Sequence, residues 1–529
     1  MCWITAVCVL LYLAIRRADP QLEALPTVGF TSPFLSYLSA FRFLVDARSM
    51  IEEGCARYPC RPFRIANFSR WIVAVSGDAL VEELRRASDD VLSFTRAAEE
   101  IAQISLVLGE SVGKNPYHIP VLQTQLTRNL HDLIPVMRDE MEAAFGDQVP
   151  RLDNGWQTIH APSTFTNIIC RISNRVFVGL PLCRDPAYIK SCTGFVHKAF
   201  KTMLLLSMTP LCLRPFVVRV ASGLPAAVRR MQRLLDPLLE DRLTQIEGVD
   251  SEFENDLVMW LVAANNGGEQ DKSHDTALRL LTANFAAIHT TSMTFVHALY
   301  NLAVHPSCAE MLRKEVRDVV AEGGWSKASI DKMYLVDSFL RETMRMQALR
   351  DVGVMRKSLK PFTFWSAVGG PSTIPAGVLV YAAAPAMHFD PAAYGDNAHT
   401  FDPLRFVPGR IIHHGHTGNV LPRNMLVGTS PNFFGWGGGK HLCPGRFFAA
   451  VEMKMMLAYL ATSFDVTTMG QEKATGGKVF PVEGLPATRP RDFRLDGNCF
   501  PNPWAKLRLR RREAVAPRQE GKRSKDGDS

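Results

Sequence analysis

A glycine-rich loop around a single cysteine constrains this chain more than any other feature. The loop runs from Phe433 to Arg446, reads FFGWGGGKHLCPGR, and is followed by an apolar stretch. Its glycines allow bare backbone to approach a flat partner and to point N–H groups at the sulfur of Cys443. Residues 447–460 have helical periodicity, so the loop places Cys443 at a helix N-terminus, where the dipole favours a thiolate. The loop therefore predicts a metal-binding thiolate, although a small buried cysteine or a surface haem-sensing motif would look similar.

Composition indicates one large globular domain with a mostly helical pattern. Of the 529 residues, 47% are hydrophobic and 21% are charged, and no low-complexity linker or internal repeat divides the chain. Helical patterns cover 35–60 and most of 120–350, including a long helix at 278–302 and another at 308–320. Short alternating runs at 63–75 and 357–384 predict strands. We expect a mainly α fold with a small β portion.

Cysteine usage and charge exclude several classes. The 11 cysteines are odd in number and form no CxxC pair, which argues against a disulfide framework and a zinc ribbon. An available thiolate favours a body that faces the cytosol. The net charge of +8 is partly local to residues 506–529, where basic residues are not interleaved with aromatic ones. This segment predicts a disordered basic tail and not a nucleic-acid-binding surface.

The first 17 residues predict a membrane anchor. Residues 1–15 are uncharged and mostly apolar, and Arg16 and Arg17 follow them. At ~1.5 Å per residue this stretch is about 22 Å long, which is short for a span, but no basic region precedes it as in a secretory signal peptide. The positive-inside rule then places the body in the cytosol. Prolines in 18–34 predict a hinge, and a second apolar patch at 203–218 is either core or a loop that dips into the bilayer.

Three further motifs lie upstream of the cysteine loop. Glu342 and Arg345 are three residues apart and share a helix face, and Arg405 sits in the turn FDPLRF; together they can form a buried charge network. The third motif, AAIHTT at 286–291, places small residues before His289 and Thr290 in the middle of the long helix. A threonine there can bond back to a carbonyl one turn earlier, or it can face a flat ligand.

These four motifs, in this order, resemble those of the cytochrome P450 family, and the finer flavour is similar to fungal microsomal, ent-kaurene oxidase-like members of secondary metabolism. The resemblance covers nearly the whole chain. It implies a P450 fold with a single haem domain at 35–505 and a non-covalent haem b whose iron has an axial cysteine thiolate. A thiolate ligand pushes electron density toward O–O cleavage.

The resemblance assigns roles residue by residue. Cys443 is the iron ligand, and His441 and Arg356 match the positions that contact the haem propionates. Trp436 stands where the family usually has phenylalanine and is expected to cover the sulfur. The remaining matches are the structural triad of Glu342, Arg345 and Arg405.

On the opposite side of the haem, Thr290 matches the distal threonine that relays protons for O–O cleavage. His289 replaces the usual acidic residue, and it is either a proton relay or a packed side chain. The early tryptophan and arginine that usually contact a propionate are missing, and His118 or Arg128 is the expected substitute.

The expected function is a monooxygenase anchored in the endoplasmic reticulum membrane, facing the cytosol. It would insert one oxygen atom from O2 into a lipophilic small molecule of terpenoid or polyketide type. Electrons would come from NADPH through NADPH-cytochrome P450 reductase, which we expect to dock around Lys440, Arg446 and Arg341. Substrate contacts are expected at 348–355, 285–290 and 203–218. The alternatives are a reductase-independent haem-thiolate isomerase and a non-catalytic haem sensor.

Overall fold

We describe the protein from a computed structural model. It describes residues 20–32, 34–149, 155–209, 211–247, 255–265, 272–408, 424–469, 472–475, 478–481 and 488–512. The expected anchor at 1–17 lies outside these residues. Within them, no helix combines the length and the apolar character needed to cross a bilayer.

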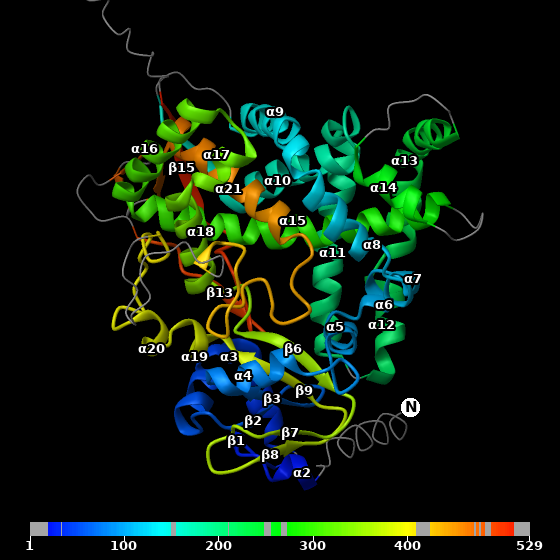
Figure 1. The fold of residues 1–529 in the computed structure, drawn as a ribbon, viewed down its shortest axis with the longest axis vertical. Helices are drawn as coiled ribbons and strands as arrows, with labels where there is room; N and C mark the ends of the chain where they lie inside the picture. The colour runs from blue at the N-terminus through cyan, green and yellow to red at the C-terminus, as the bar shows by residue number, and fades with distance from the viewer. Residues whose placement is uncertain are drawn as a thin grey trace, which may run out of the picture.

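Helices make up most of the fold, as expected, and they fill the upper part of Figure 1. The long helices are α3 (Ser36–Arg57), α9 (Leu130–Gln148), α10 (Ala161–Phe177), α11 (Pro186–Ser207), α13 (Leu224–Glu247), α15 (Lys272–Val304), α16 (Pro306–Gly323), α18 (Tyr334–Met346) and α21 (Arg446–Ser463). The shorter ones are α2 (Pro20–Glu23), α4 (Asp78–Arg86), α5 (Phe94–Ala102), α6 (Ile104–Val107), α7 (Glu110–Lys114), α8 (His118–Val121), α12 (Arg214–Ala221), α14 (Leu257–Ala264), α17 (Lys327–Lys332), α19 (Ala384–His388) and α20 (Pro391–Tyr394). Single turns of other helix types are η1 (Leu122–Leu126), η2 (Leu182–Arg184) and η3 (Leu211–Leu213).

Several helices begin where the sequence supplies the right first residues. At the start of α11, Asp185 accepts a hydrogen bond from the backbone N–H of Tyr188 at 2.7 Å, and Pro186 occupies the first turn. Asp256 caps α14 in the same way, through the N–H of Met259 at 2.8 Å.

A mixed six-stranded sheet forms the lower part of the molecule (Figure 1). Its order is β1 (Thr27–Val28), β2 (Phe63–Ala66), β3 (Trp71–Val75), β9 (Leu379–Ala383), β6 (Val352–Ser358) and β4 (Leu92–Ser93). In β3, Val73 and Val75 pack in one apolar cluster while Ile72 and Ala74 pack in another. Successive side chains of a strand point to opposite faces, so both faces of this sheet are covered.

One of the small remaining sheets contradicts the expectation of a disordered tail from residue 506 onward. The antiparallel order β10 (Phe464–Thr468), β15 (Lys506–Arg511), β5 (Gln157–His160) places residues 506–511 in the middle of a sheet and not in a disordered segment. Leu507 and Leu509 alternate with basic residues and are buried, which is the pattern of a half-buried strand. The other pairs are β7 (Phe362–Phe364) with β8 (Ser372–Ile374), β11 (Glu472–Thr475) with β12 (Lys478–Pro481), and β13 (Phe493–Leu495) with β14 (Asn498–Phe500).

Helix α15 crosses the centre of the molecule and organises the site. Helices α10, α11 and α13 pack along it, and α21 and α18 contact it as well (Figure 1). The loop that precedes α21 lies between α15 and the sheet in this view. The cysteine loop is thereby enclosed between the helical part and the β part of one domain.

Candidate haem site

The cysteine loop is held by its own backbone. The N–H of Cys443 donates to the carbonyl oxygen of Trp436 at 2.9 Å, and α21 begins three residues later at Arg446, as expected. Burial raises the pKa of the Cys443 thiol, whereas the N–H of Gly445 and the charge of Arg446 act in the opposite direction. A cation or metal at the sulfur would oppose the effect of burial and favour the thiolate.

Trp436 and the glycines shape the loop. The indole N–H of Trp436 donates to the carbonyl oxygen of Leu426 at 2.7 Å, which fixes the ring beside the loop. Gly439 has a φ of +70°, and a Cβ placed on it would lie 2.2 Å from the carbonyl oxygen of Arg85. Only glycine fits there, because the loop touches the backbone at the end of α4.

Helix α15 has an accessible patch in its buried middle. Most of its length is buried, but Ala286 and Thr290 are exposed, and we call these two residues the open face of α15. The Thr290 hydroxyl donates to the carbonyl oxygen of Ala286 at 2.8 Å. The middle of this long helix is therefore accessible at the place of the motif.

His289 turns toward α11. Its ring lies 4.6 Å from the ring of Phe200, centroid to centroid, and its Nε2 is buried without a hydrogen-bond partner among the described residues. Burial, with a smaller contribution from His197, lowers the pKa of His289 to about 4. The imidazole is therefore neutral at physiological pH.

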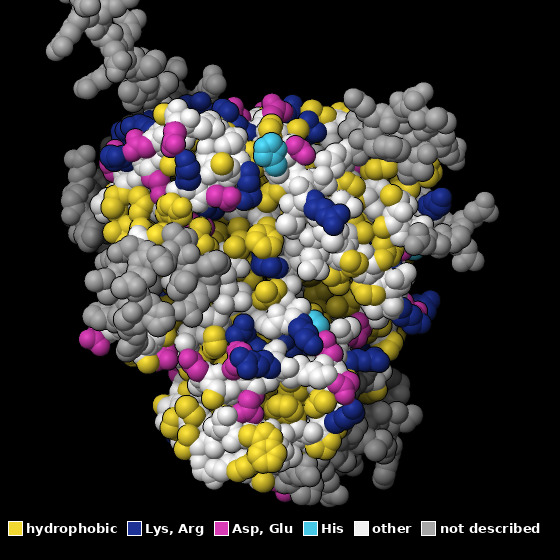
Figure 2. Space-filling view, in the orientation of Figure 1, with side chains coloured by type: hydrophobic (Ala, Val, Ile, Leu, Met, Phe, Trp, Pro, Cys, Tyr) yellow, Lys and Arg dark blue, Asp and Glu magenta, His cyan; other side chains and the backbone are white. Residues whose placement is uncertain are grey.

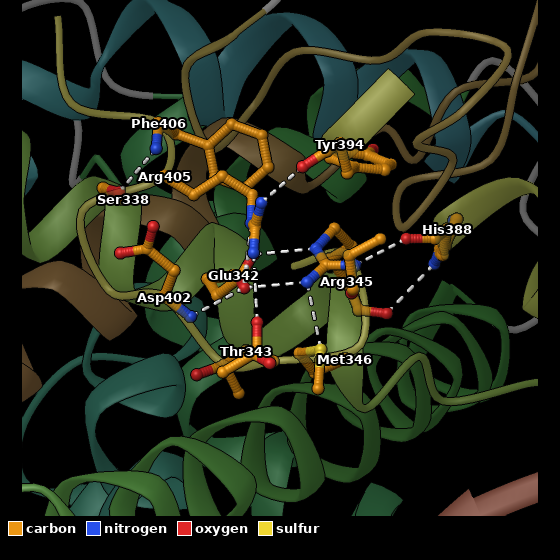
Figure 3. A network of polar contacts seen from close by, with 12 residues as sticks. Ser338, Glu342, Thr343, Arg345, Met346, His388, Tyr394, Asp402, Arg405 and Phe406 are labelled. Carbon is orange, nitrogen blue, oxygen red and sulfur yellow. Dashed lines mark hydrogen bonds and ion pairs between the residues drawn. The ribbon is translucent and has the colours of Figure 1, made fainter. Parts of the chain in front are cut away.

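The structure brings the expected charge network together (Figure 3). Arg345 Nε donates to Glu342 Oε2 at 2.8 Å, and Arg405 Nε donates to Glu342 Oε1 at 3.1 Å. The N–H of Asp402 adds a third donor to this carboxylate at 2.9 Å, and Arg345 also reaches the carbonyl oxygen of His388 at 2.6 Å. Every donor and acceptor in this buried cluster thus helps to fix the segment that leads to the cysteine loop.

Arg356 lies where the cysteine loop meets β6. Its Nη2 donates to the carbonyl oxygen of Gly438 at 3.1 Å, whereas its Nε is buried without a partner among the described residues. The pKa of Arg356 is lowered to about 10, mainly by burial; Asp89 opposes this shift and Arg85 adds to it. Such a site attracts an anionic group.

Arg85 belongs to this site but escaped the sequence reasoning. Its Nη1 pairs with Glu82 at 2.7 Å, but its Nε is buried, lies 3.1 Å from the Cβ position of Gly438, and has no partner in the described part of the chain. No motif surrounds Arg85, and only the close approach of α4 to the glycines reveals it.

His441 lies beside the same loop. Its Nε2 is 2.7 Å from Asp89 Oδ1, and its ring stacks on Phe94 with centroids 4.8 Å apart. Since both Asp89 and Phe94 come from the segment after α4, His441 ties that segment to the cysteine loop.

The suggestion that His118 or Arg128 contacts a propionate stays a prediction. His118 is buried against Arg279, whose Nη1 lies 3.1 Å from its Nδ1, and burial lowers the pKa of His118 to about 4. Arg128 is exposed. The prediction that Arg341 belongs to a docking surface is wrong, because it is 2% exposed and its guanidinium lies 3.8 Å from the centroid of the Phe433 ring. Its Nη1 also donates to the carbonyl oxygen of Met425 at 2.6 Å.

The segments expected to contact substrate converge at one cavity. Arg350 and Val352, from 348–355, line it together with Met203 and Leu204 of α11. Phe200 lines the same cavity and contacts His289 on α15. The cavity therefore ends next to the third expected segment, 285–290.

These observations fit the haem that the sequence resemblance implies. Two buried guanidinium nitrogens, from Arg85 and Arg356, have no partner among the residues that the structure describes, and they suit propionate groups. Cys443 supplies a sulfur, and the open face of α15 supplies accessible surface in the middle of a mostly buried helix. Figure 2 shows a recess lined by hydrophobic side chains between α11 and the cysteine loop, as a flat apolar ring requires.

Comparisons with known proteins agree with this site. The family model "Cytochrome P450" matches residues 120–478. "Cytochrome P450 monooxygenase 103" of Postia placenta is 38% identical over 86% of this chain and 89% of its own. "Cytochrome P450 monooxygenase 151" of the same fungus is 37% identical over 94% of this chain and 95% of its own.

A solved structure shows the same fold. It is titled "Retinoic acid bound cyanobacterial CYP120A1", and it aligns with a TM-score of 0.64 at 18% sequence identity, over 92% of this chain and 97% of that one. Since the family model covers more than half of the chain, the sequence matches establish more than the fold. The chain belongs to the cytochrome P450 family, as a monooxygenase with a haem-thiolate iron cofactor and electrons supplied by a reductase.

Proposed function

We propose that this monooxygenase inserts one oxygen atom from O2 into a lipophilic small molecule of terpenoid or polyketide type, in the biosynthesis of a secondary metabolite. The observation that carries this proposal is the open face of α15 across from the cysteine loop. The recess in Figure 2 lies between the cysteine loop and α11, and α11 packs on α15, which carries Thr290. An apolar substrate in that recess would meet the oxygen chemistry that the thiolate-bound haem supplies when bound.

We assign Cys443 as the axial ligand, and Arg85, Arg356 and His441 as candidate contacts of the propionates. Trp436 excludes water from the sulfur. Glu342, through Arg345 and Arg405, positions the segment before the loop and does not touch the reacting atoms.

Thr290 is the proposed proton donor at the open face. Its hydroxyl can exchange its bond to the Ala286 carbonyl for a bond to a group in the recess. His289 is neutral because burial lowers its pKa to about 4, so we propose that it accepts protons only transiently and mainly packs on Phe200.

Replacing Thr290 tests its role. We expect Thr290→Ala to keep haem binding but to release several-fold more hydrogen peroxide per NADPH consumed, because proton delivery is impaired. Thr291→Ala is the matched control, since Thr291 is buried one residue away. Equal peroxide release from both variants would exclude the proposed role.

The proposed reductase surface consists of Lys440 and Arg446, without Arg341. Lys440 is exposed and Arg446 is partly exposed, and Figure 2 shows Lys and Arg side chains across the middle of this face. We propose that acidic residues of NADPH-cytochrome P450 reductase dock there. Lys440→Glu should slow the first reduction step in stopped-flow measurements, with haem content unchanged. Arg61→Glu, an exposed charge reversal on another segment, should leave the rate as it is; equal effects would refute the docking site.

We also propose that the protein is attached to the endoplasmic reticulum membrane with its domain in the cytosol. The proposal rests on the apolar residues 1–15 and on large apolar side chains exposed on the described surface. Those on and just before α3 are Phe34, Leu38, Phe41 and Val45, and those between α11 and the end of α12 are Leu213, Phe216 and Val220. They include the 203–218 patch, which the structure therefore places only partly in the core.

A ferrous–CO spectrum tests the central assignment. The purified wild type should show the Soret band of thiolate-ligated haem, and Cys443→Ala should lose it. Cys212→Ala, which removes an exposed cysteine, should retain the band. Retention of the band in Cys443→Ala would overturn the assignment. Product formation that depends on NADPH and reductase then separates a monooxygenase from an isomerase, and metabolite profiling of a deletion strain identifies the pathway.

A further inference from the structure

A cavity of about 160 Å³ lies between α5, α11 and the large sheet. Apolar side chains from several helices and strands line much of its wall; examples are Phe43, Ile72, Ile101, Met203, Val352 and Leu379. Phe200 forms the wall toward α15. Polar and charged side chains line the rest of it, among them Gln103, Arg350 and Asn498. A cavity that combines apolar walls with convergent polar groups is typical of a site for a small organic molecule.

Three arginines line this cavity, and two of them are engaged. Arg70 forms an ion pair with Glu100, which also pairs with Lys357. Arg214 Nε donates to the carbonyl oxygen of Thr209 at 3.1 Å. These two arginines are therefore part of the wall.

Arg350 is different. Its Nε is buried and has no hydrogen-bond partner among the described residues. The adjacent acid, Asp351, is paired with Arg494 at 2.6 Å. Asp496, which also lines the cavity, accepts from Asn67 at 3.4 Å and forms no ion pair with Arg350 within 4 Å. A half-buried guanidinium without a counter-charge costs free energy unless an anion reaches it.

The position of Arg350 fits substrate recognition. It lies at the start of the segment that leads into β6, and Phe200 closes the other end of the cavity against His289. A molecule bound at Arg350 would extend its apolar skeleton past Phe200 toward Thr290, the residue after His289. Arginine presents two parallel N–H donors that match a carboxylate.

We propose that the substrate is a lipophilic carboxylic acid, and that Arg350 binds its carboxylate while the skeleton reaches the open face of α15. This inference deepens the proposed function and rests on it. It predicts that oxidation occurs on the skeleton at a distance from the acid group. Arg350 is a specificity-determining residue and takes no part in the oxygen chemistry.

Paired ligands test the proposal on the full-length haem-loaded enzyme. The probes are abietic acid and palmitic acid, each with its methyl ester, and the readout is the substrate-induced shift of the haem Soret band. At least one acid should bind more tightly than its ester. Arg350→Gln should weaken that acid roughly tenfold and change ester binding less than about twofold, because only the charge-assisted bonds are lost. Arg350→Lys should restore part of the preference.

Arg317→Gln is the control, because Arg317 is exposed on α16 and is not part of the cavity wall. The proposal fails if neither acid is preferred over its ester, or if Arg350→Gln weakens acid and ester equally, as expected for a water-filled cavity. Equilibrium dialysis of labelled acid gives the same comparison without a haem signal. A normal ferrous–CO band with no acid preference would refute this inference alone, whereas a missing band would refute the proposed function.

Discussion

Glu342 neutralises two arginines in a place that water does not reach. Its carboxylate is 0% exposed and accepts hydrogen bonds from Arg345, Arg405 and the backbone of Asp402 (Figure 3). Burying the three charges costs desolvation, so the cluster adds more to the precision of the fold than to its net stability. Removing one member, however, leaves the others without compensation.

We expect Glu342→Gln to destabilise the protein by about 3–5 kcal/mol, because two buried guanidinium groups lose their counter-charge. Thermal unfolding and haem content measure the effect. Asp318→Asn is the control; Asp318 is 63% exposed and pairs with Lys314, so its loss should cost under about 0.5 kcal/mol. A similar cost for both variants would contradict the structural role of Glu342.

Glu452 is a second buried carboxyl group, on α21 after the cysteine loop. Burial raises its pKa from 4.5 to about 8, and its Oε1 accepts from Ser173 at 2.9 Å. The folded state therefore binds a proton that the unfolded chain loses above its ordinary pKa. Stability is greatest below pH 4.5 as far as this group is concerned, and it falls as the pH rises toward 8.

Glu452→Gln removes this dependence, because an amide keeps the hydrogen bond but cannot ionise. We expect the variant to be about 1–3 kcal/mol more stable than the wild type at pH 8, with a smaller difference at pH 5. Urea unfolding of the haem-loaded enzyme at both pH values measures it. Glu322→Gln, at a 68% exposed position, should change neither value. A pH-independent gain would mean that packing, not ionisation, explains the result.

At the scale of elements, sequence periodicity correctly predicted several helices and strands. The helix expected at 35–60 and the strands expected at 63–75 correspond to α3, β2 and β3. β15 was missed because its charge suggested a solvated tail, while the alternating Leu507 and Leu509 carried the strand signal. The basic residues of β15 indicate that one face of the strand contacts solvent. They give no information about the opposite face, which is buried.

β15 provides a test of that correction. We expect Leu509→Ala to destabilise the protein by about 2–4 kcal/mol, because Leu509 is 1% exposed between β10 and β5. Lys506→Ala, on the same strand but exposed, should have little effect. Thermal unfolding compares them, and equal melting temperatures would show that residues 506–511 do not form this strand in solution.

The residues of the site also fall into those that the sequence predicted and those that it did not. Local motifs placed the cysteine loop and the charge network, since both depend on short spacings within one segment. Arg85 and Arg350 could not be predicted from such spacings, because only the tertiary fold buries their Nε atoms, which have no partner within the described part of the chain. Arg341 shows the reverse: we expected it on the docking surface for the reductase, and the fold buries it against the ring of Phe433.

At the scale of the whole molecule, exposed apolar side chains gather on two elements. α3 carries Phe41, which is 58% exposed, and α12 carries Phe216 and Val220 at 71% and 76%. Such exposure is unfavourable in water and is typical of surfaces that meet a membrane or a partner. In Figure 1, α12 extends down the molecule toward the end that holds α2 and the sheet.

We expect a fluorophore attached at Val220→Cys to be quenched by brominated lipids when the full-length protein is bound to phospholipid vesicles, because this side chain enters the bilayer interface. The same fluorophore at Arg317→Cys should remain unquenched. Selective labelling requires Cys212→Ala, since Cys212 is exposed nearby. Absence of quenching at Val220→Cys would place α12 away from the lipid.

The hydrogen bond between Thr290 and Ala286 also affects which ligands this enzyme binds most readily. The Thr290 hydroxyl donates its proton to the Ala286 carbonyl oxygen at 2.8 Å, so the lone pairs of the hydroxyl oxygen can accept a hydrogen bond from a bound ligand. An alcohol arriving at that spot is accommodated at once, whereas a ketone must first make the side chain rotate. In successive oxidations of one carbon, Thr290 would therefore bind the alcohol formed first more readily than the ketone formed from it.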